Sequence, residues 1–257
     1  KVSLDFLVDE LNLSLIKLAS GEITNGPMVL KAAGKGRPII LSTGMSTLDE
    51  IEVALGVVAF GFLKTDEPPS LTGFRNAYRS YQGQRVLQQN VRLLHCTTEY
   101  PAPFDEVHLR AMPALSERFG LPVGYSDHTR CISVAQAAVA LGAVVLEKHF
   151  TLDRNFPGPD HKASLEPREL AVMIRSVREI ERALGKRCKI PTASEMKNIP
   201  VVRKSLVAAR DIAVGETFTT ENLAVKRPGT GISPMKFWEV LGQRVNRRYR
   251  LEELIEP

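Results

Sequence analysis

The 257-residue sequence contains no run of about 18 apolar residues, so we expect no membrane-spanning helix. Its opening residues, 1–6, lack the apolar stretch and small-residue cleavage site of a signal peptide. Only three cysteines occur, Cys96, Cys131 and Cys188, and this odd, sparse number argues against a disulfide framework. We therefore expect a cytoplasmic protein with reduced thiols and no membrane partner.

Several catalytic motifs are also missing. There is no P-loop, no G-x-G-x-x-G after a predicted strand, no G-x-S-x-G and no C-x-x-C. These absences disfavour nucleotide hydrolysis, dinucleotide-dependent redox chemistry and serine hydrolase chemistry. Cys96 follows a predicted strand beside His95, so a thiol nucleophile is conceivable, but a small buried residue is the favoured interpretation.

The charge is unevenly distributed along a chain whose composition is that of an ordinary globular protein, 44% apolar and 25% charged. The net charge is +5, and residues 187–257 carry all of it, with 13 Lys and Arg against 8 Asp and Glu. A solvated basic face and a site for an anion both fit this excess. No RNA-binding run, zinc-finger spacing or long basic tract is present, so an anionic metabolite is favoured over nucleic acid.

One pattern repeats through residues 1–186: a short apolar run ends in polar residues, and an amphipathic segment follows. The predicted strands are 13–20, 38–43, 91–98, 121–127 and 143–151, and the predicted helices are 26–34, 47–62, 105–119, 130–142 and 167–184. Near-continuous apolar strands that alternate with helices indicate a parallel sheet covered by helices. Catalytic residues of such folds lie at the carboxyl ends of the strands.

A closed (β/α) barrel needs eight βα units, and this chain shows five. The chain also opens with a helical pattern at 4–11 that no strand precedes. Either the sheet is open, or about three βα units are missing at the N-terminus. Residues 64–90 are interpreted as an elaborated connection containing helices at 71–80 and 83–89.

The repeating pattern ends after Gly185. The sequence predicts a partial barrel over 1–186, a linker over 187–199 and a small β-rich domain over 200–257. A domain of this size is marginally stable alone and is expected to lean on another surface.

His128 and His149 follow two successive predicted strands and can point into one cleft, where imidazoles could bind Mn²⁺ or Zn²⁺. Two ordinary polar histidines are the alternative. Strand alternation places Glu147 on the same side as His149, where its carboxylate could orient the imidazole.

Other polar residues at the strand ends are candidates for binding anions and hydroxyls. Lys17 lies within an apolar strand, where a buried ammonium needs an anion. The remaining candidates each have ordinary turn chemistry as their alternative. They are Ser20, Ser42 and Ser126 for an anion, Glu22, Tyr100 and Asp160 for a polyol, and Arg227 as a basic tip of the small domain.

Seven segments in order resemble the sialic acid synthase family, which includes the N-acetylneuraminate, legionaminate and pseudaminate synthases. They are 17–25 (KLASGEITN), 38–45 (PIILSTGM), 94–101 (LHCTTEYP), 124–129 (GYSDHT), 146–151 (LEKHFT), 157–160 (PGPD) and 225–231 (VKRPGTG). The resemblance implies an incomplete TIM barrel followed by an antifreeze-like (SAF) domain, in a domain-swapped homodimer. It also implies condensation of phosphoenolpyruvate with an N-acylmannosamine-type sugar, giving a nine-carbon 2-keto acid and phosphate.

The resemblance further implies a role for each matching residue. His128 and His149 correspond to the ligands of a divalent metal, Mn²⁺ or Mg²⁺, that acts as a Lewis acid. Lys17 and Ser42 correspond to residues around the phosphoenolpyruvate carboxylate, and Ser20 and Ser126 to residues around its phosphate. Glu22, Tyr100 and Asp160 correspond to sugar contacts, and Arg227 to the arginine that contacts the acylamino group. Lys17, Glu22, His128 and His149 are the candidate catalytic residues.

The sequence departs from the family in two respects. Nothing matches the first barrel strands, which carry a catalytic Glu, so the chain is interpreted as N-terminally truncated. Thr98 stands where neuraminate synthases carry Asn, in a position that borders both phosphate and sugar, so the acceptor sugar stays open. The insert at 64–90 weakly favours the legionaminate branch. Two alternatives are a non-catalytic sugar- or anion-binding fragment and a lyase or aldolase that forms a Schiff base at Lys17.

Overall fold

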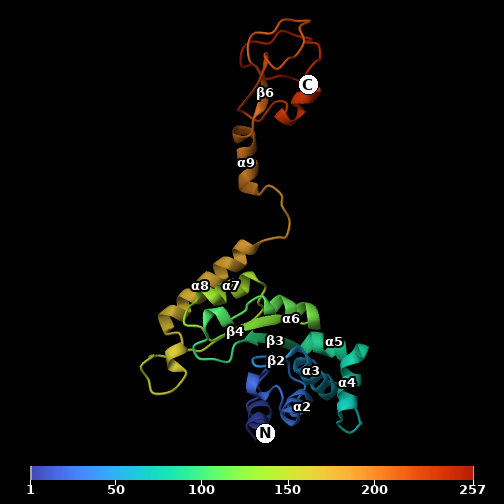
Figure 1. Cartoon of the computed structure of the whole chain (residues 1–257), viewed down its shortest axis with the longest axis vertical. Coiled ribbons are helices and arrows are strands. Elements are labelled where there is room, and N and C mark those ends of the chain that lie inside the picture. The colour runs from blue at the N-terminus through green and yellow to red at the C-terminus, as the bar shows by residue number, and fades with distance from the viewer. Residues whose placement is uncertain (1, 257) are drawn as a thin grey trace. The chain divides into compact units, whose positions relative to one another are not determined.

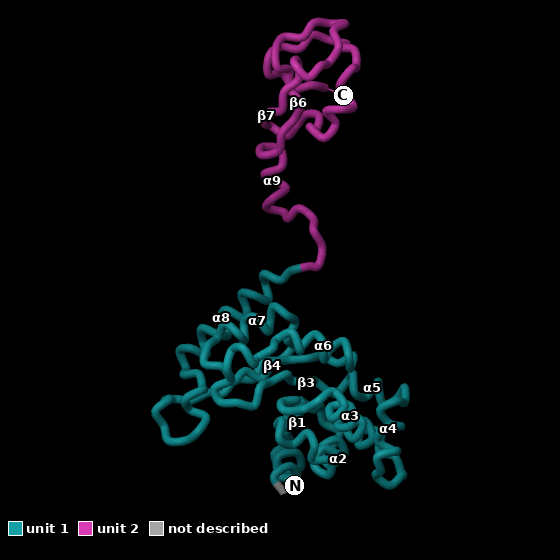
Figure 2. Tube along the Cα trace, viewed as in Figure 1, with its two compact units in different colours: residues 1–185 teal, residues 186–257 magenta. Residues whose placement is uncertain are grey.

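The computed structural model of the protein describes residues 2–256. The chain divides into two compact units, residues 1–185 and 186–257, which are coloured separately in Figure 2. Each unit has its own hydrophobic core. Over the described residues, none of the helices is both long enough and apolar enough to span a bilayer.

The first unit alternates strands with helices, as the sequence predicts (Figure 1). Its strands are β1 (Ile16–Leu18), β2 (Ile39–Ser42), β3 (Val91–Cys96), β4 (Val123–Asp127) and β5 (Leu146–Lys148). Its α-helices are α1 (Val2–Asp5), α2 (Gly26–Gly34), α3 (Leu48–Leu63), α4 (Leu71–Arg79), α5 (Tyr81–Asn90), α6 (Ala111–Phe119), α7 (Ser133–Ala140) and α8 (Pro167–Leu184). Shorter turns are the π-helical η1 (Phe6–Glu10) and the 3-10 turns η2 (Ser20–Glu22), η3 (Phe104–Glu106) and η4 (His161–Ala163).

The five strands form one parallel sheet in the order β1-β2-β3-β4-β5. Neighbouring strands lie about 4.8 Å apart, so β1 and β5 would be about 19 Å apart in a flat sheet. Yet Lys17 Nζ on β1 lies 3.0 Å from Glu147 Oε1 on β5. The sheet is therefore curled into a partial barrel, and the predicted fold class is confirmed.

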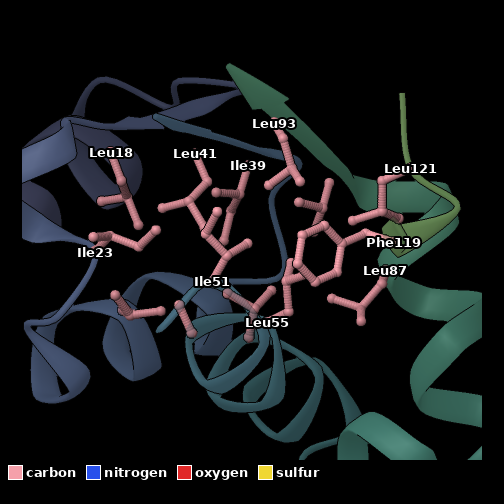
Figure 3. Close-up of a cluster of buried hydrophobic side chains, with 14 of the residues drawn as sticks. Leu18, Ile23, Ile39, Leu41, Ile51, Leu55, Leu87, Leu93, Phe119 and Leu121 are labelled. Atoms are coloured by element: carbon pink, nitrogen blue, oxygen red, sulfur yellow. The ribbon is translucent and has the colours of Figure 1, made fainter. Parts of the chain in front are cut away.

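The convex face of the sheet packs against helices. Side chains alternate along each strand, so Ile39, Leu41 and Leu93 face this layer and are fully buried. Figure 3 shows them converging with Ile51 and Leu55 of α3. Helix α3 begins at a capping box. The Glu50 amide donates to the Thr47 hydroxyl, and the Thr47 amide donates to the Glu50 carboxylate. The remaining residues of this cluster that Figure 3 labels are Leu18, Ile23, Leu87, Phe119 and Leu121.

The insertion over 64–90 is part of this unit and not a domain. Helices α4 and α5 pack against α3, where the rings of Phe60 and Phe74 meet edge to face with centroids 5.2 Å apart. The interpretation of this segment as an elaborated connection therefore holds.

The second unit has a core of its own around the antiparallel strands β6 (Ser205–Ala208) and β7 (Leu223–Lys226). A 3-10 turn η5 (Pro234–Lys236) and helix α10 (Phe237–Val240) follow. Where the sequence predicts a linker over 187–199, the structure has helix α9 (Ala193–Val202). Thr192 and Glu195 form a capping box at its start, and this local signal outweighs Pro200 near its end.

Candidate active site

The concave face of the sheet gathers the polar residues of the strand ends. Cys96, Ser126 and Glu147 lie in register on β3, β4 and β5, so their side chains form one row across three strands. Curling of the sheet brings Lys17 of β1 to the same row. The site thus combines residues that are up to 130 positions apart in the chain.

Glu147 is the centre of a polar network on this face. Its Oε1 atom lies 3.0 Å from Lys17 Nζ and accepts a 2.7 Å hydrogen bond from Ser126 Oγ. The Lys17 side chain is about one-third exposed, so it is less buried than the sequence suggests, but the anion expected beside it is present. Glu147 does not orient His149, contrary to expectation, because Lys17 and Ser126 hold its carboxylate.

The rings of Tyr100, His128 and His149 lie together beside this network. The His128 ring centroid lies 4.2 Å from that of Tyr100 and 5.4 Å from that of His149. Two bonds tie the loop after β3 to His128: His128 Nδ1 lies 2.6 Å from the Thr97 carbonyl, and the Ala102 amide donates to the His128 carbonyl at 2.9 Å. These bonds hold Tyr100 against the imidazole.

The environment of His128 favours a neutral imidazole. Its side chain is buried, and burial lowers the pKa of the ring, with proximity to the His149 ring acting in the same direction. Because Nδ1 donates to the Thr97 carbonyl, the lone pair lies on Nε2, 3.3 Å from Ser126 Oγ. Metal-binding histidines are held in this way, with the other ring nitrogen donating to a carbonyl.

A metal at this position would receive two protein ligands, His128 and His149. Within residues 2–256, no three side chains of His, Cys, Asp or Glu gather as a metal site. The remaining coordination positions would belong to water or substrate, as in catalytic metal sites, which keep open positions. His128 and His149 are the two side chains that could hold such an ion.

A second cluster lies at the ends of β2 and β3. Ser20 Oγ lies 3.0 Å from Cys96 Sγ and accepts a 3.1 Å hydrogen bond from the Gly44 amide. The hydroxyl groups of Ser42 and Thr98 are buried without a hydrogen-bond partner. Buried polar groups are normally paired, so these two hydroxyls indicate a place for a polar ligand. Cys96 is buried, consistent with the favoured interpretation that it is not a nucleophile.

Gly44 is a residue that sequence reasoning missed. A Cβ atom there would lie 2.3 Å from Thr98 Oγ1, 2.8 Å from Ser20 Oγ and 2.9 Å from Cys96 Sγ. A glycine that directly follows a strand is a signal for close approach, and could have been read from the sequence.

Replacing Gly44 with alanine is expected to lower the free energy of unfolding by about 1–3 kcal/mol and to weaken binding of inorganic phosphate. The added methyl group displaces the Thr98 and Ser20 hydroxyls. Thermal unfolding and calorimetry with phosphate measure the two effects. Gly21→Ala is the matched control, because a Cβ at Gly21 meets no atom within 4 Å. Equal behaviour of the two variants would contradict this assignment.

Of the three remaining candidates, Asp160 lies beside His149, whereas Glu22 and Arg227 make their contacts outside these clusters. Glu22, in η2, accepts a 2.7 Å bond from Asn25 Nδ2, the residue that caps α2. Asp160 Oδ2 lies 3.8 Å from His149 Nδ1. Arg227 lies in the second unit, where its Nε donates to the Val202 carbonyl at the end of α9, at 3.2 Å.

Comparison with known proteins extends these observations. Residues 1–189 match the NeuB family, and residues 203–250 match the SAF domain. An N,N'-diacetyllegionaminic acid synthase of Campylobacter jejuni is 51% identical over 97% of this chain and 68% of its own length. A protein of the same name from Legionella pneumophila is 41% identical over 95% of this chain and 62% of its own length.

A solved structure of a related synthetase is similar to this chain in both sequence and fold. The N-acetylneuraminic acid (sialic acid) synthetase of Leptospira borgpetersenii, in complex with citrate, is 32% identical and superposes with a TM-score of 0.60. The match covers 74% of this chain and 58% of that protein. The chain therefore spans roughly three-fifths to two-thirds of the proteins it resembles.

Proposed function

The chain belongs to the NeuB family of sialic acid synthases, and from this premise we propose that it takes part in condensing phosphoenolpyruvate with an N-acylated amino sugar. The products are a nine-carbon 2-keto sugar acid and phosphate. The observation that carries the proposal is the meeting of Lys17, Ser126 and Glu147 with the His128 and His149 pair on one concave face.

The anion-binding residues supply the first part of the chemistry. Phosphoenolpyruvate carries a carboxylate and a phosphate. The site offers the Lys17 ammonium, the Ser20 hydroxyl beside the Gly44 amide, and the Ser42 hydroxyl, which has no hydrogen-bond partner. In this proposal Lys17 and Ser42 bind the carboxylate, while Ser20 and Ser126 bind the phosphate.

The reaction forms one carbon–carbon bond and one carbon–oxygen bond to water, and it breaks the carbon–oxygen bond to phosphate. The methylene carbon of phosphoenolpyruvate bonds to the aldehyde carbon, and the aldehyde oxygen takes up a proton to become a hydroxyl. Water adds at the carbon that bears the phosphate, and that carbon becomes the keto group as phosphate leaves; the two protons of the water balance the new hydroxyl and the departing phosphate. An ion held by His128 and His149, Mn²⁺ or Mg²⁺, would supply Lewis-acid polarisation of the aldehyde oxygen. Tyr100 packs against both imidazoles and limits the directions in which their rings can turn.

The acceptor sugar is proposed from the relatives. Identity of 51% and 41% to two N,N'-diacetyllegionaminic acid synthases favours a 6-deoxy diacetamido sugar over N-acetylmannosamine. Glu22, Thr98, Tyr100 and Asp160 contact it in this proposal, and Arg227 of a partner subunit binds its acylamino group. A domain-swapped homodimer acting in the cytoplasm completes the proposal.

The test is phosphate release from phosphoenolpyruvate by this chain, with Mn²⁺ and a panel of both sugar types. Release that depends on the diacetamido sugar supports the proposal. Binding of phosphoenolpyruvate and Mn²⁺ without release would favour the alternative of a binding fragment. If the chain neither binds phosphoenolpyruvate and Mn²⁺ nor releases phosphate, the proposed function is wrong.

The Schiff-base alternative makes a different prediction. Because Lys17 is ion-paired with Glu147, its amine is a poor nucleophile, and borohydride is expected to trap no substrate on it. A covalent adduct at Lys17, found by mass spectrometry, would favour an aldolase instead.

A further inference from the structure

A loop precedes α8 (Figure 1), and its two ends are hydrogen-bonded to each other next to His149. The Leu165 amide donates to the His149 carbonyl at 2.9 Å, and the Thr151 amide donates to the Leu165 carbonyl at 2.9 Å. These two bonds close residues 152–164 into a loop whose base is the backbone of a proposed metal ligand. The loop carries Asp160, whose carboxylate lies 3.8 Å from His149 Nδ1.

Two side chains at the base of the loop, those of Thr151 and Ser164, form hydrogen bonds with residues 160 and 161 of the loop. The Thr151 side chain is buried, and its Oγ1 lies 2.7 Å from Nδ1 of His161, the neighbour of Asp160. The same hydroxyl donates to the Asp153 carbonyl at 3.0 Å, so it accepts from His161. Ser164, also buried, donates to the Asp160 carbonyl at 2.8 Å.

The His161 ring is held by packing as well. It meets the Phe156 ring edge to face, with centroids 5.6 Å apart. A Cβ at Gly158 would lie 3.1 Å from His161 Cδ2, so the backbone at Gly158 lies directly against the ring. His161 is therefore held by Thr151, Phe156 and Gly158 within the loop.

We propose that the Thr151–His161 hydrogen bond is a clasp that positions Asp160 beside His149. It rests on the proposed function only in that His149 is taken as a metal ligand. A carboxylate near the second ring nitrogen of a metal-binding histidine fixes the orientation of the ring and raises its basicity, and losing it typically weakens metal binding about 10- to 100-fold. Thr151 and His161 are thus positioning residues that act through Asp160.

The first experiment measures Mn²⁺ affinity of the whole chain by calorimetry. Thr151→Val is expected to weaken binding about tenfold, as is Asp160→Asn, whereas Thr151→Ser keeps the hydroxyl and restores affinity. Because Thr151 acts through Asp160, the double variant should bind no more weakly than Asp160→Asn alone. Ser116→Ala, which removes a comparable 3.0 Å bond to the Leu121 carbonyl in α6, is the control for general destabilisation.

The second experiment needs no metal. The ring signals of His149 in a ¹H–¹⁵N spectrum should shift alike in Thr151→Val and in Asp160→Asn. They should shift in the same way in His161→Phe, which puts an aromatic ring without Nδ1 in place of the imidazole. They should stay unchanged in Ser116→Ala. Unchanged His149 signals in Thr151→Val would overturn the clasp. Failure of the unaltered chain to bind Mn²⁺ would instead overturn the metal assignment, and the ring signals would still decide the clasp.

Discussion

Replacing Lys148 with methionine is expected to lower the free energy of unfolding of the first unit by about 3–5 kcal/mol. Lys148 and Asp127 are both almost completely buried, and Nζ lies 3.0 Å from Oδ2 as an ion pair that lacks a well-directed hydrogen bond. Lys148 also donates to the Thr129 carbonyl. Removing the ammonium takes the cation away from the buried Asp127 carboxylate, which keeps only the bonds that the Thr129 amide and hydroxyl donate to Oδ1, and it takes a donor from the Thr129 carbonyl.

Urea unfolding followed by circular dichroism measures this loss, because the longest helices lie in the first unit. The sole tryptophan, Trp238, lies in the second unit, so its fluorescence follows the unfolding of that unit separately. Arg178→Met is the matched control: it removes an exposed pair with Glu181 on α8 and should cost less than about 0.5 kcal/mol. Adding Asp127→Asn to Lys148→Met should recover part of the loss, since it removes the unpaired charge. A cost for Lys148→Met as small as that of the control would contradict the buried-pair interpretation.

Replacing His149 with alanine is expected to weaken Mn²⁺ binding by about 100-fold or more, because losing a ligand costs more than losing a group that orients one. His149 is the cleaner choice of the two imidazoles. Its side chain is one-third exposed, whereas His128 is buried and its loss would leave the Thr97 carbonyl unpaired.

Calorimetry with Mn²⁺ makes the measurement, and thermal unfolding shows whether the fold is kept. His95→Gln is the matched control. His95 lies on β3 of the same sheet, but its ring points to the opposite face, where Nε2 lies 2.7 Å from the Val107 carbonyl. Glutamine can keep that bond, so Mn²⁺ affinity should not change. If His149→Ala binds Mn²⁺ with wild-type affinity, the assignment of the metal to this site is wrong.

Most strands and helices of the first unit follow from the sequence. Apolar runs that end in polar residues mark all five strands, and α2 and α8 have the bounds that the periodicity predicts. The helix predicted over 105–119 is shorter, because the 3-10 turn η3 occupies 104–106 and α6 begins at Ala111. In the second unit, Pro191 and Pro200 suggested an irregular segment, whereas Thr192 and Glu195 form the capping box of helix α9. The capping-box residues were visible in the sequence, but the sequence alone did not show that the helix would form in spite of the two prolines.

The sequence by itself determined which side chains stand at the strand ends and, by alternation, which face of the sheet they occupy. It placed Glu147 and His149 on one side of their strand, and it predicted that the strand ends, Lys17 and Ser126 among them, share one site. Only the tertiary structure decided which of these groups meet. Lys17 reaches Glu147 because the sheet curls, and Asp160 rather than Glu147 lies beside His149 because a hydrogen-bonded loop brings it there. Periodicity along a strand carries information about faces, but curvature and loop closure depend on packing summed over the whole unit.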